Sequence, residues 1–263
     1  MEEQKKVFLT GGIVVCVIAL AVILYFLFFR TTKEAPVSVK SPVAQQEALP
    51  EKVEPVQLET DQPEPIDVDL GRSDDVVREE AAGLSSNDLF SNWLQTEGII
   101  SHFTAAVDNI ANGLSPRAHI DFFEPAEEFN VEWESDIAYI SPASYKRYNP
   151  VAAVVSSLDT DGCADLFLRL KPSFQEAYTE LGYPQADFLK TLERAFVELL
   201  EVPIPGEDIA LEKKVETFAY QDPKLEGLSE AQKHLLRMGP VNIRRIQGKI
   251  REIGRALGMT LSP

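Results

Sequence analysis

The sequence predicts a mainly α protein, in which a helical globular domain with a small β-hairpin follows one transmembrane helix and a disordered stalk. Three observations lead to this prediction. The chain begins with a long run of uncharged apolar residues and continues with a Pro-rich acidic stretch. From Leu84 onward apolar residues recur at helical spacing, and one short segment, 129–140, alternates with the period of two that is typical of strands.

The apolar run extends from Val7 to Phe29 and contains 23 residues without a charge. A helix of that length spans about 34 Å, which is enough to cross the hydrocarbon core of a bilayer. No Ala-x-Ala cleavage site follows Phe29, and the residues before Cys16 lack the small residue of a lipoprotein cleavage site. We therefore expect an uncleaved transmembrane helix at 7–29, in contact with the lipid bilayer.

Basic residues flank both ends of this helix and nearly balance. Lys5 and Lys6 precede it, and Arg30 and Lys33 follow it. An N-terminus in the cytoplasm leaves only a short basic head, 1–6, on the inner side and sends the acidic remainder of the chain outward. We therefore expect a single-pass protein with a cytoplasmic head at 1–6 and the globular domain outside.

The segment 30–83 has the composition of a stalk. Six prolines between Pro36 and Pro65 are interleaved with Glu, Val and Gln, and no apolar period is sustained. Such a chain reaches between about 40 Å as a flexible coil and roughly 150 Å when fully extended. Two interpretations stay open: a tether without fixed length, or a spacer matched to a target such as the cell wall.

The globular domain is expected at 84–259, where helix signals follow one another. Asp187 is a helix cap before an apolar stripe, Gly113 ends a helix, and Pro172 should bend or split a helix near Lys171. Ser229 opens another helix, and Gly239-Pro240 restarts the last one. The expected helices begin at or near Ser86, Ile99, Asn149, Asp161, Asp187, Ser229 and Val241; a hairpin lies at 129–140, and 209–218 alternates loosely like a strand.

Composition excludes several classes of function. A net charge of -17 argues against nonspecific binding to nucleic acid, because the phosphate backbone repels the summed field. The three histidines, His102, His119 and His234, are scattered, and no His-Glu-x-x-His, Gly-x-Ser-x-Gly or phosphate-loop motif occurs. We therefore expect no metal and no cofactor.

Three segments resemble one bacterial family. They are YKRYNPV (145–151), EAYTELGYP (176–184) and HLLRMGPVNIRRIQGKIREI (234–253), in this order behind a membrane helix and a stalk. The chain resembles the family called domain of unknown function 3014 over roughly 88–258, and Val241 departs from the polar or acidic residue expected in its motif. The resemblance implies a bacterial, Gram-negative envelope setting, hence an inner-membrane protein with a periplasmic domain, and it brings no established activity.

Basic residues gather near the end of this acidic chain. A helical wheel places Arg244, Arg251 and Arg255 together, opposite the stripe of Ile243 and Ile246. Gly in a helix interior costs about 1 kcal/mol relative to Ala, so a glycine among arginines is consistent with close approach by another molecule. Arg is suited to carboxylate or phosphate contacts. The candidate binding residues are Arg237, Arg244, Arg245, Gly248, Arg251 and Arg255; pairing with the domain's own acids, or a plain solvated face, is the alternative.

A second candidate surface surrounds the hairpin. Tyr145 and Tyr148, with Arg147 between them, could stack on sugars, and Trp133 and Tyr139 lie nearby in the sequence. The alternative is that these aromatic residues belong to the core.

Two main functions follow from these features. The first is an envelope binding or scaffolding module that contacts the cell wall or another envelope protein. The second is a membrane-tethered cell-wall hydrolase that uses a carboxylate pair about 5 to 10 Å apart. A helper subunit of an envelope complex is a third possibility. The acids that could supply the carboxylate pair are Glu127, Glu128, Glu132, Glu134 and Asp136.

Overall fold

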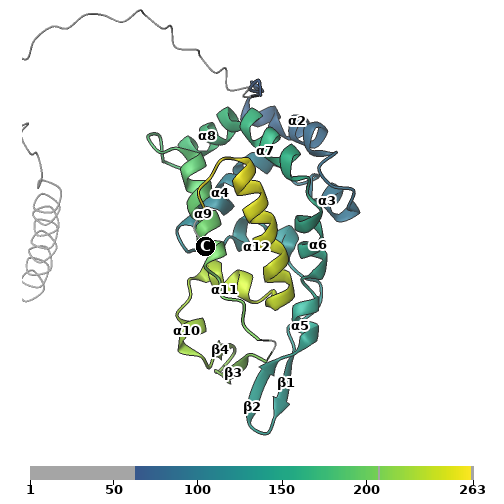
Figure 1. Cartoon of the computed structure of the whole chain (residues 1–263), viewed down its shortest axis with the longest axis vertical. Helices are drawn as coiled ribbons and strands as arrows, with labels where there is room; N and C mark the ends of the chain where they lie inside the picture. The colour runs from purple at the N-terminus through teal and green to yellow at the C-terminus, as the bar shows by residue number, and fades with distance from the viewer. Residues whose placement is uncertain (1–62, 207, 262–263) are drawn as a thin grey trace, which may run out of the picture. The chain divides into compact units, whose positions relative to one another are not determined.

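The computed structural model describes residues 63–206 and 208–261, drawn in colour in Figure 1. The expected cytoplasmic head, transmembrane helix and residues 30–62 of the expected stalk lie outside these residues. Among the helices of the described segments, none is both long enough and apolar enough to cross a membrane.

The described chain is mainly helical, as the sequence predicted, and short 3-10 turns accompany the helices. The 3-10 turns are η1 (Leu70–Arg72), η2 (Arg117–His119) and η3 (Asp121–Phe123). The α-helices are α2 (Ser73–Ala81), α3 (Asp88–Trp93), α4 (Ile99–Ala111), α5 (Pro142–Lys146), α6 (Asn149–Ser157), α7 (Thr160–Arg169), α8 (Lys171–Glu180), α9 (Phe188–Leu200), α10 (Pro223–Glu226), α11 (Glu230–Leu236) and α12 (Gly239–Ala256).

Several helix ends follow the expected local chemistry. The Asp187 carboxylate accepts a hydrogen bond from the Leu189 amide at the start of α9. Ser229 and Gln232 form a reciprocal capping box that opens α11. The expected break at Pro172 is confirmed, since α7 ends at Arg169 and α8 begins at Lys171, with Pro172 where its missing amide costs nothing.

The expected stalk boundary at residue 83 is wrong. Helix α2 lies within the segment assigned to the stalk, and its Val77 and Ala81 are buried against the helical core. The Arg78 guanidinium donates to the Leu94 carbonyl at 2.8 Å. Arg169 forms an ion pair with Glu80, with 2.7 Å between nitrogen and oxygen. Few apolar residues mark this helix, so its acidic composition resembled that of the preceding tether.

The expected hairpin is confirmed but is only half of the sheet. Strands β1 (Val131–Glu134) and β2 (Ile137–Ile140) pair antiparallel, and β3 (Ala210–Lys213) and β4 (Phe218–Tyr220) extend the sheet in the order β1-β2-β3-β4. Ala138 pairs with Leu211 in the register that joins the two hairpins. The segment that alternated loosely in the sequence is therefore the second hairpin.

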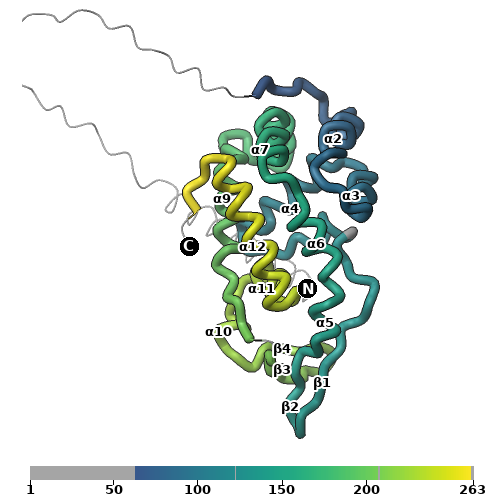
Figure 2. The backbone as a smooth tube through the Cα atoms, turned by 45° about the vertical axis from the view of Figure 1, so that its right-hand side comes forward, coloured from purple at the N-terminus to yellow at the C-terminus, as the bar shows by residue number. Residues whose placement is uncertain are grey.

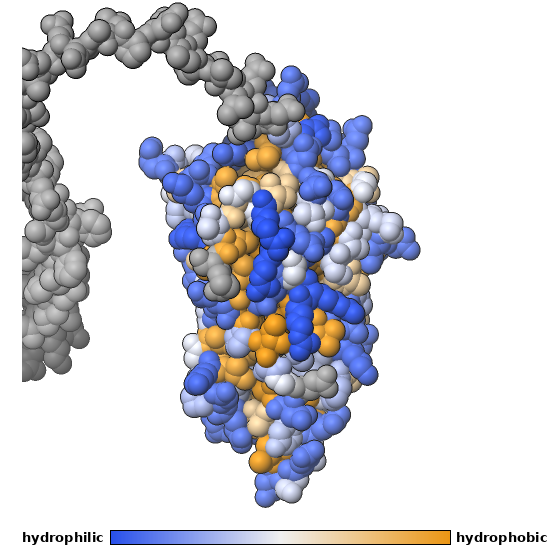
Figure 3. All heavy atoms as spheres, in the orientation of Figure 1, coloured by the Kyte–Doolittle hydropathy of each residue, from blue (hydrophilic) through white to orange (hydrophobic). Residues whose placement is uncertain are grey.

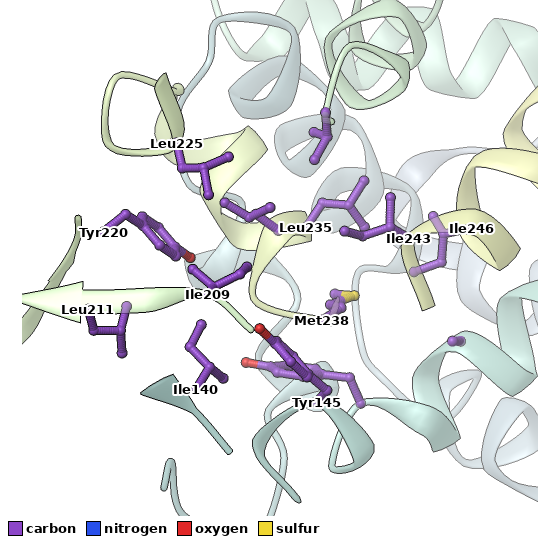
Figure 4. Packing of buried hydrophobic residues seen from close by; sticks show 14 of the residues in the cluster. Ile140, Tyr145, Ile209, Leu211, Tyr220, Leu225, Leu235, Met238, Ile243 and Ile246 are labelled. Carbon is purple, nitrogen blue, oxygen red and sulfur yellow. The ribbon is translucent and has the colours of Figure 1, made fainter. Parts of the chain in front are cut away.

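Two apolar clusters form the core. The first joins the sheet to α11 and α12, and Figure 4 shows Ile140, Leu211 and Tyr220 of the sheet directed toward Leu235 and Ile243 of these helices. The second lies among α2, α4, α7, α8 and α9, at the end of the domain away from the sheet (Figure 2). Phe196 of α9 packs against both clusters, so the two parts form one continuous interior.

A buried amide joins α12 to the end of α9. Gln247 is 2% exposed, and its Nε2 donates to the carbonyls of Leu199, Leu200 and Val202 at 3.0, 3.3 and 2.9 Å. The Leu199 carbonyl also accepts from the Glu201 and Val202 amides, so this side chain chiefly serves the carbonyls of Leu200 and Val202 at the end of the helix. Gln247 therefore sets the position of α12 against α9.

Substitution of Gln247 by Ala should lower the free energy of unfolding by about 2–3 kcal/mol, because it leaves buried carbonyls unpaired and opens a small cavity. Urea denaturation followed by circular dichroism measures this change. The matched control Gln221→Ala, at an exposed position, should change the free energy by less than about 0.5 kcal/mol. Equal effects for the two variants would contradict a stabilising role for the hydrogen bonds of Gln247.

Candidate functional site

Helix α12 has a buried side and an exposed side. Ile243, Ile246 and Ile250 are buried, which confirms the predicted apolar stripe. The helix begins at Gly239, whose φ of +82° suits glycine, and a Cβ there would lie 2.5 Å from the ring of Tyr145. The opposite side of α12 is consequently directed outward.

We call this exposed side the arginine face, made of Arg244, Arg245, Gly248, Arg251 and Arg255. Arg244, Arg245 and Arg255 are exposed and Arg251 is half-buried. Figure 3 shows strongly hydrophilic side chains along the line of α12, bordered by apolar surface. Within the described segments, no carboxylate lies within 4.0 Å of these four guanidinium groups. Close pairing with the domain's own acids, the alternative considered from the sequence, is therefore not observed there.

The acid nearest in sequence is already engaged. Glu252 pairs with Lys249 at 2.7 Å and accepts a hydrogen bond from the Thr160 hydroxyl at 3.1 Å. These two hydrogen bonds lower the pKa of Glu252, with a smaller electrostatic contribution from Arg255. Lys249, which lies between these arginines in the sequence, is thus turned toward α7. The arginines are not involved in these contacts.

Gly248 lies among these arginines without a packing reason inside the described chain. Apart from its chain neighbours and the backbone of α12 itself, no described atom lies within 4 Å of the position that a Cβ would take. Gly254 on the same helix is different, because a Cβ there would lie 2.3 Å from the Leu261 side chain. A side chain at 254 would displace Leu261, whereas the glycine at 248 leaves an open notch.

Three of the four remaining candidate residues line a polar pocket of about 570 Å³, whereas Tyr145 does not. Arg147 and Tyr148 line it from the turn after α5, and Arg237 lines it from the end of α11. The pocket does not include the arginine face. Its other ionisable lining residues are Arg117, His234, Glu124, Glu127, Glu128 and Glu230, so two of the five acids considered for catalysis are in it.

Arg147 is held rigidly in this pocket. Its Nε donates to the Ser144 carbonyl at 3.0 Å and its Nη1 to the Glu127 carbonyl at 3.2 Å. The guanidinium carbon lies 4.9 Å from the ring centroid of Tyr148 and 5.6 Å from that of Phe129. Both distances are in the range of cation–π contacts. A fixed guanidinium beside carboxylates suits a ligand that carries both signs of charge.

His234 lines the same pocket, and the sequence did not single it out as a site residue. It is one helical turn before Arg237 on α11. Burial, with smaller electrostatic contributions from Arg237 and Arg117, lowers its pKa to about 4. The imidazole is therefore neutral at pH 7 and is available as a hydrogen-bond partner. The three-residue spacing between His234 and Arg237 could have pointed to His234. That spacing is informative only once both side chains are known to face the same pocket.

Tyr145 belongs to the core, and so does most of Tyr148. Both side chains are less than a tenth exposed and pack in the cluster beside the sheet. Asn242, which is 1% exposed, donates through its Nδ2 to the Tyr145 carbonyl at 3.2 Å, the Asn149 Oδ1 at 3.0 Å and the Met238 carbonyl at 2.9 Å. This amide fastens the start of α12 to the segment 145–149.

Comparison with protein families gives a match to the family described as Protein of unknown function (DUF3014) over residues 99–254. That match covers more than half of the chain. The chain belongs to the DUF3014 family. The matched region is somewhat shorter than the 88–258 expected from the resemblance. No curated protein and no solved structure matches the chain.

The hydrogen bonds of Asn242 join two of the segments that resemble the DUF3014 family. Segments 145–151 and 234–253, far apart in the sequence, meet where the Asn242 amide bonds Tyr145 and Asn149. Val241, the residue that departs from the expected motif, is 46% exposed beside them.

In the described part of this DUF3014 protein, no group of three His, Cys, Asp or Glu side chains is placed to hold a metal ion.

The stability of the domain should fall as the pH decreases from about 6.5 to 4. In that window the unfolded chain protonates His234, whose ordinary pKa is 6.5, while the folded domain keeps it neutral. The contribution is fully present above pH 6.5 and reaches a loss of roughly 2–3 kcal/mol near pH 4. Denaturation curves at several pH values measure it. His234→Gln should flatten this dependence and the exposed control His102→Gln should not; a slope unchanged in His234→Gln would contradict the assignment.

Proposed function

We propose that this DUF3014 protein is a single-pass inner-membrane protein of the bacterial envelope, anchored by 7–29, whose periplasmic helical domain is a binding module. Its arginine face docks an acidic segment of another envelope protein. The uncharged run of 23 residues supports the anchor, and the Pro-rich composition after it supports a spacer.

The observation that carries this proposal is the set of arginines without a close acidic partner in a chain whose net charge is -17. Like charges spaced three and four residues apart on one helix repel one another and destabilise the helix slightly. Folding of the domain gains no ion pair from them in the described segments. A bound acidic partner would remove that repulsion and supply charge-assisted hydrogen bonds.

The spacing along α12 favours a helical partner. Val241, Arg244, Gly248, Arg251 and Arg255 are separated by three and four residues alternately, the spacing of a contact stripe between packed helices. A glycine in the middle of such a stripe lets two backbones approach closely, and the open position at Gly248 provides that space. A cell-wall carboxylate could pair with the arginines but would make no use of the notch.

The double substitution Arg244→Ala and Arg251→Ala should weaken partner binding by about 10- to 100-fold, because arginine anchors dominate small interfaces. A tagged full-length chain is cross-linked in cells, and quantitative mass spectrometry measures the membrane proteins recovered with it. The matched control is Arg72→Ala with Arg194→Ala, two exposed arginines away from α12. Recovery that is identical for both double variants and the parent chain would refute the arginine face as a docking site.

A Gly248→Leu chain separates shape from charge in the same assay. Leu favours helix over Gly by about 0.5–1 kcal/mol, so the domain should become slightly more stable while the notch is filled. Partner recovery should decrease although every arginine is retained. Increased stability with undiminished recovery would show that the notch is not in the interface.

The membrane arrangement has its own test. Alkaline phosphatase fused after Pro263 should be active in intact cells, because this enzyme requires the oxidising periplasm for its disulfides. The same fusion to a chain that lacks residues 7–29 should be inactive and should leave the membrane fraction. Activity of the truncated fusion, or inactivity of the full-length fusion, would contradict the predicted anchor or its orientation.

A second candidate function is the membrane-tethered cell-wall hydrolase. One observation favours it: Glu127, Glu128 and Glu230 line the same polar pocket as the neutral His234. Acid–base chemistry on a glycan needs two carboxylates across a cleft, and this pocket is the place for them. The two functions differ in their dependence on the arginine face, because a hydrolase in the polar pocket would keep its activity when Arg244 and Arg251 are replaced.

A further inference from the structure

An apolar chamber of about 350 Å³, partly open to solvent, lies among the helices of the domain. Helices α2, α4, α7, α9 and α12 all contribute to its walls, with smaller contributions from α3, α6 and α8. Every described lining side chain is a hydrocarbon except Cys163 and Lys249. The chamber is separate from both the polar pocket and the arginine face.

A space of this kind needs an explanation. Protein interiors are close-packed, and voids larger than one water molecule are few. An apolar void of about 150 Å³ already binds benzene, and the chamber has about twice that volume. Water does not fill it well, because a buried water needs two to four polar partners and the lining offers almost none.

Lys249 closes one side of the chamber without offering its charge to a ligand. Its hydrocarbon stem is part of the wall, and the side chain is only 11% exposed. Its Nζ donates to the Leu158 carbonyl at 2.8 Å and to the Thr160 hydroxyl at 3.0 Å, and pairs with Glu252 at 2.7 Å. All three ammonium donors are used, so the interior suits an uncharged chain and not an anion.

The rim of the chamber is formed by half-buried side chains such as Leu84, Phe90 and Leu257. A ligand with an apolar tail and a polar head could bury the tail between them and keep the head in water. A long, flexible methylene chain adapts to a narrow space between helices, whereas a rigid ring system would have to match its outline.

We propose that this chamber binds the single acyl chain of a membrane-derived amphiphile, either a free fatty acid or a lysophospholipid. The supply of such a ligand from the bilayer rests on the proposed membrane anchor. The chemistry of the chamber does not, because its volume and lining belong to the described domain alone.

Cys163 provides a reporter inside the chamber. Burial raises the pKa of its thiol to about 11, so the group is uncharged and reacts slowly. The chain has one other cysteine, Cys16, and the substitution Cys16→Ser leaves Cys163 as the single thiol. The full-length Cys16→Ser chain in phosphatidylcholine nanodiscs is then labelled with iodoacetamide at pH 9, with no addition, with palmitic acid, or with lysophosphatidylcholine.

An occupant should slow the labelling of Cys163 by about tenfold when its concentration is ten times its dissociation constant, because only the unoccupied fraction reacts. Slowing by palmitic acid alone identifies a fatty acid, and slowing by lysophosphatidylcholine identifies the lipid with the larger head. Both outcomes support the acyl-chain site. Labelling that is unchanged with palmitic acid and also unchanged with lysophosphatidylcholine overturns it.

Chamber-filling variants show that the protection arises in the chamber and not in the surrounding lipid. Ala81, which is 4% exposed, lines the chamber, whereas its neighbour Ala82 is exposed. In the Cys16→Ser background, Ala81→Leu should abolish protection by the amphiphile and Ala82→Leu should preserve it. If Ala81→Leu fails to fold, Val155→Phe fills the chamber from α6. Equal protection in a folded filling variant and in Ala82→Leu overturns the proposal, whatever the topology fusion reports about the membrane anchor.

Discussion

The arrangement of this domain depends on how α12 is held. Its buried side carries two amides, and each donates to three oxygens: Gln247 to the end of α9, and Asn242 to the Met238 carbonyl and the segment 145–149. Apolar packing by Ile243 and Ile246 pulls the helix inward but tolerates some rotation, whereas amide geometry does not. Because these bonds fix the rotation of α12, they also determine which residues face outward. The arginine face is a consequence of the buried amides on the other side.

Local signals predicted most of the helices, and long-range contacts account for the errors. The caps at Asp187 and Ser229 and the break at Pro172 act within one turn of chain, so the sequence reveals them. Helix α2 has only a narrow apolar stripe, and its stability comes from contacts such as the Arg78 hydrogen bond to Leu94. The pairing of β2 with β3 joins segments about 70 residues apart, and no local pattern encodes it.

The candidate sites also differ in whether local sequence signals could predict them. The arginines of α12 could be grouped from the sequence because helical periodicity alone places them together. The polar pocket could not, because Arg147 and Arg237 come from segments that only the folded chain brings close, and His234 gains its low pKa there. The sequence assigned Gly248 a role in close approach but could not distinguish it from Gly254. The distinction depends on Leu261, which packs against one glycine and leaves the other open.

One helix serves both proposed sites, since Ile250 and Ile253 of α12 line the chamber while Arg244 and Arg251 lie on the docking face. Shared structure does not by itself couple two sites. An acyl chain would alter docking only if it bound more tightly to one of two positions of α12 than to the other. The contacts that would have to change are those of Lys249 with Leu158 and Thr160, which tie α12 to the chamber wall. The buried amides of Gln247 and Asn242 oppose such a shift, because moving α12 would leave several carbonyls unpaired. The geometry therefore favours two independent sites on a rigid helix.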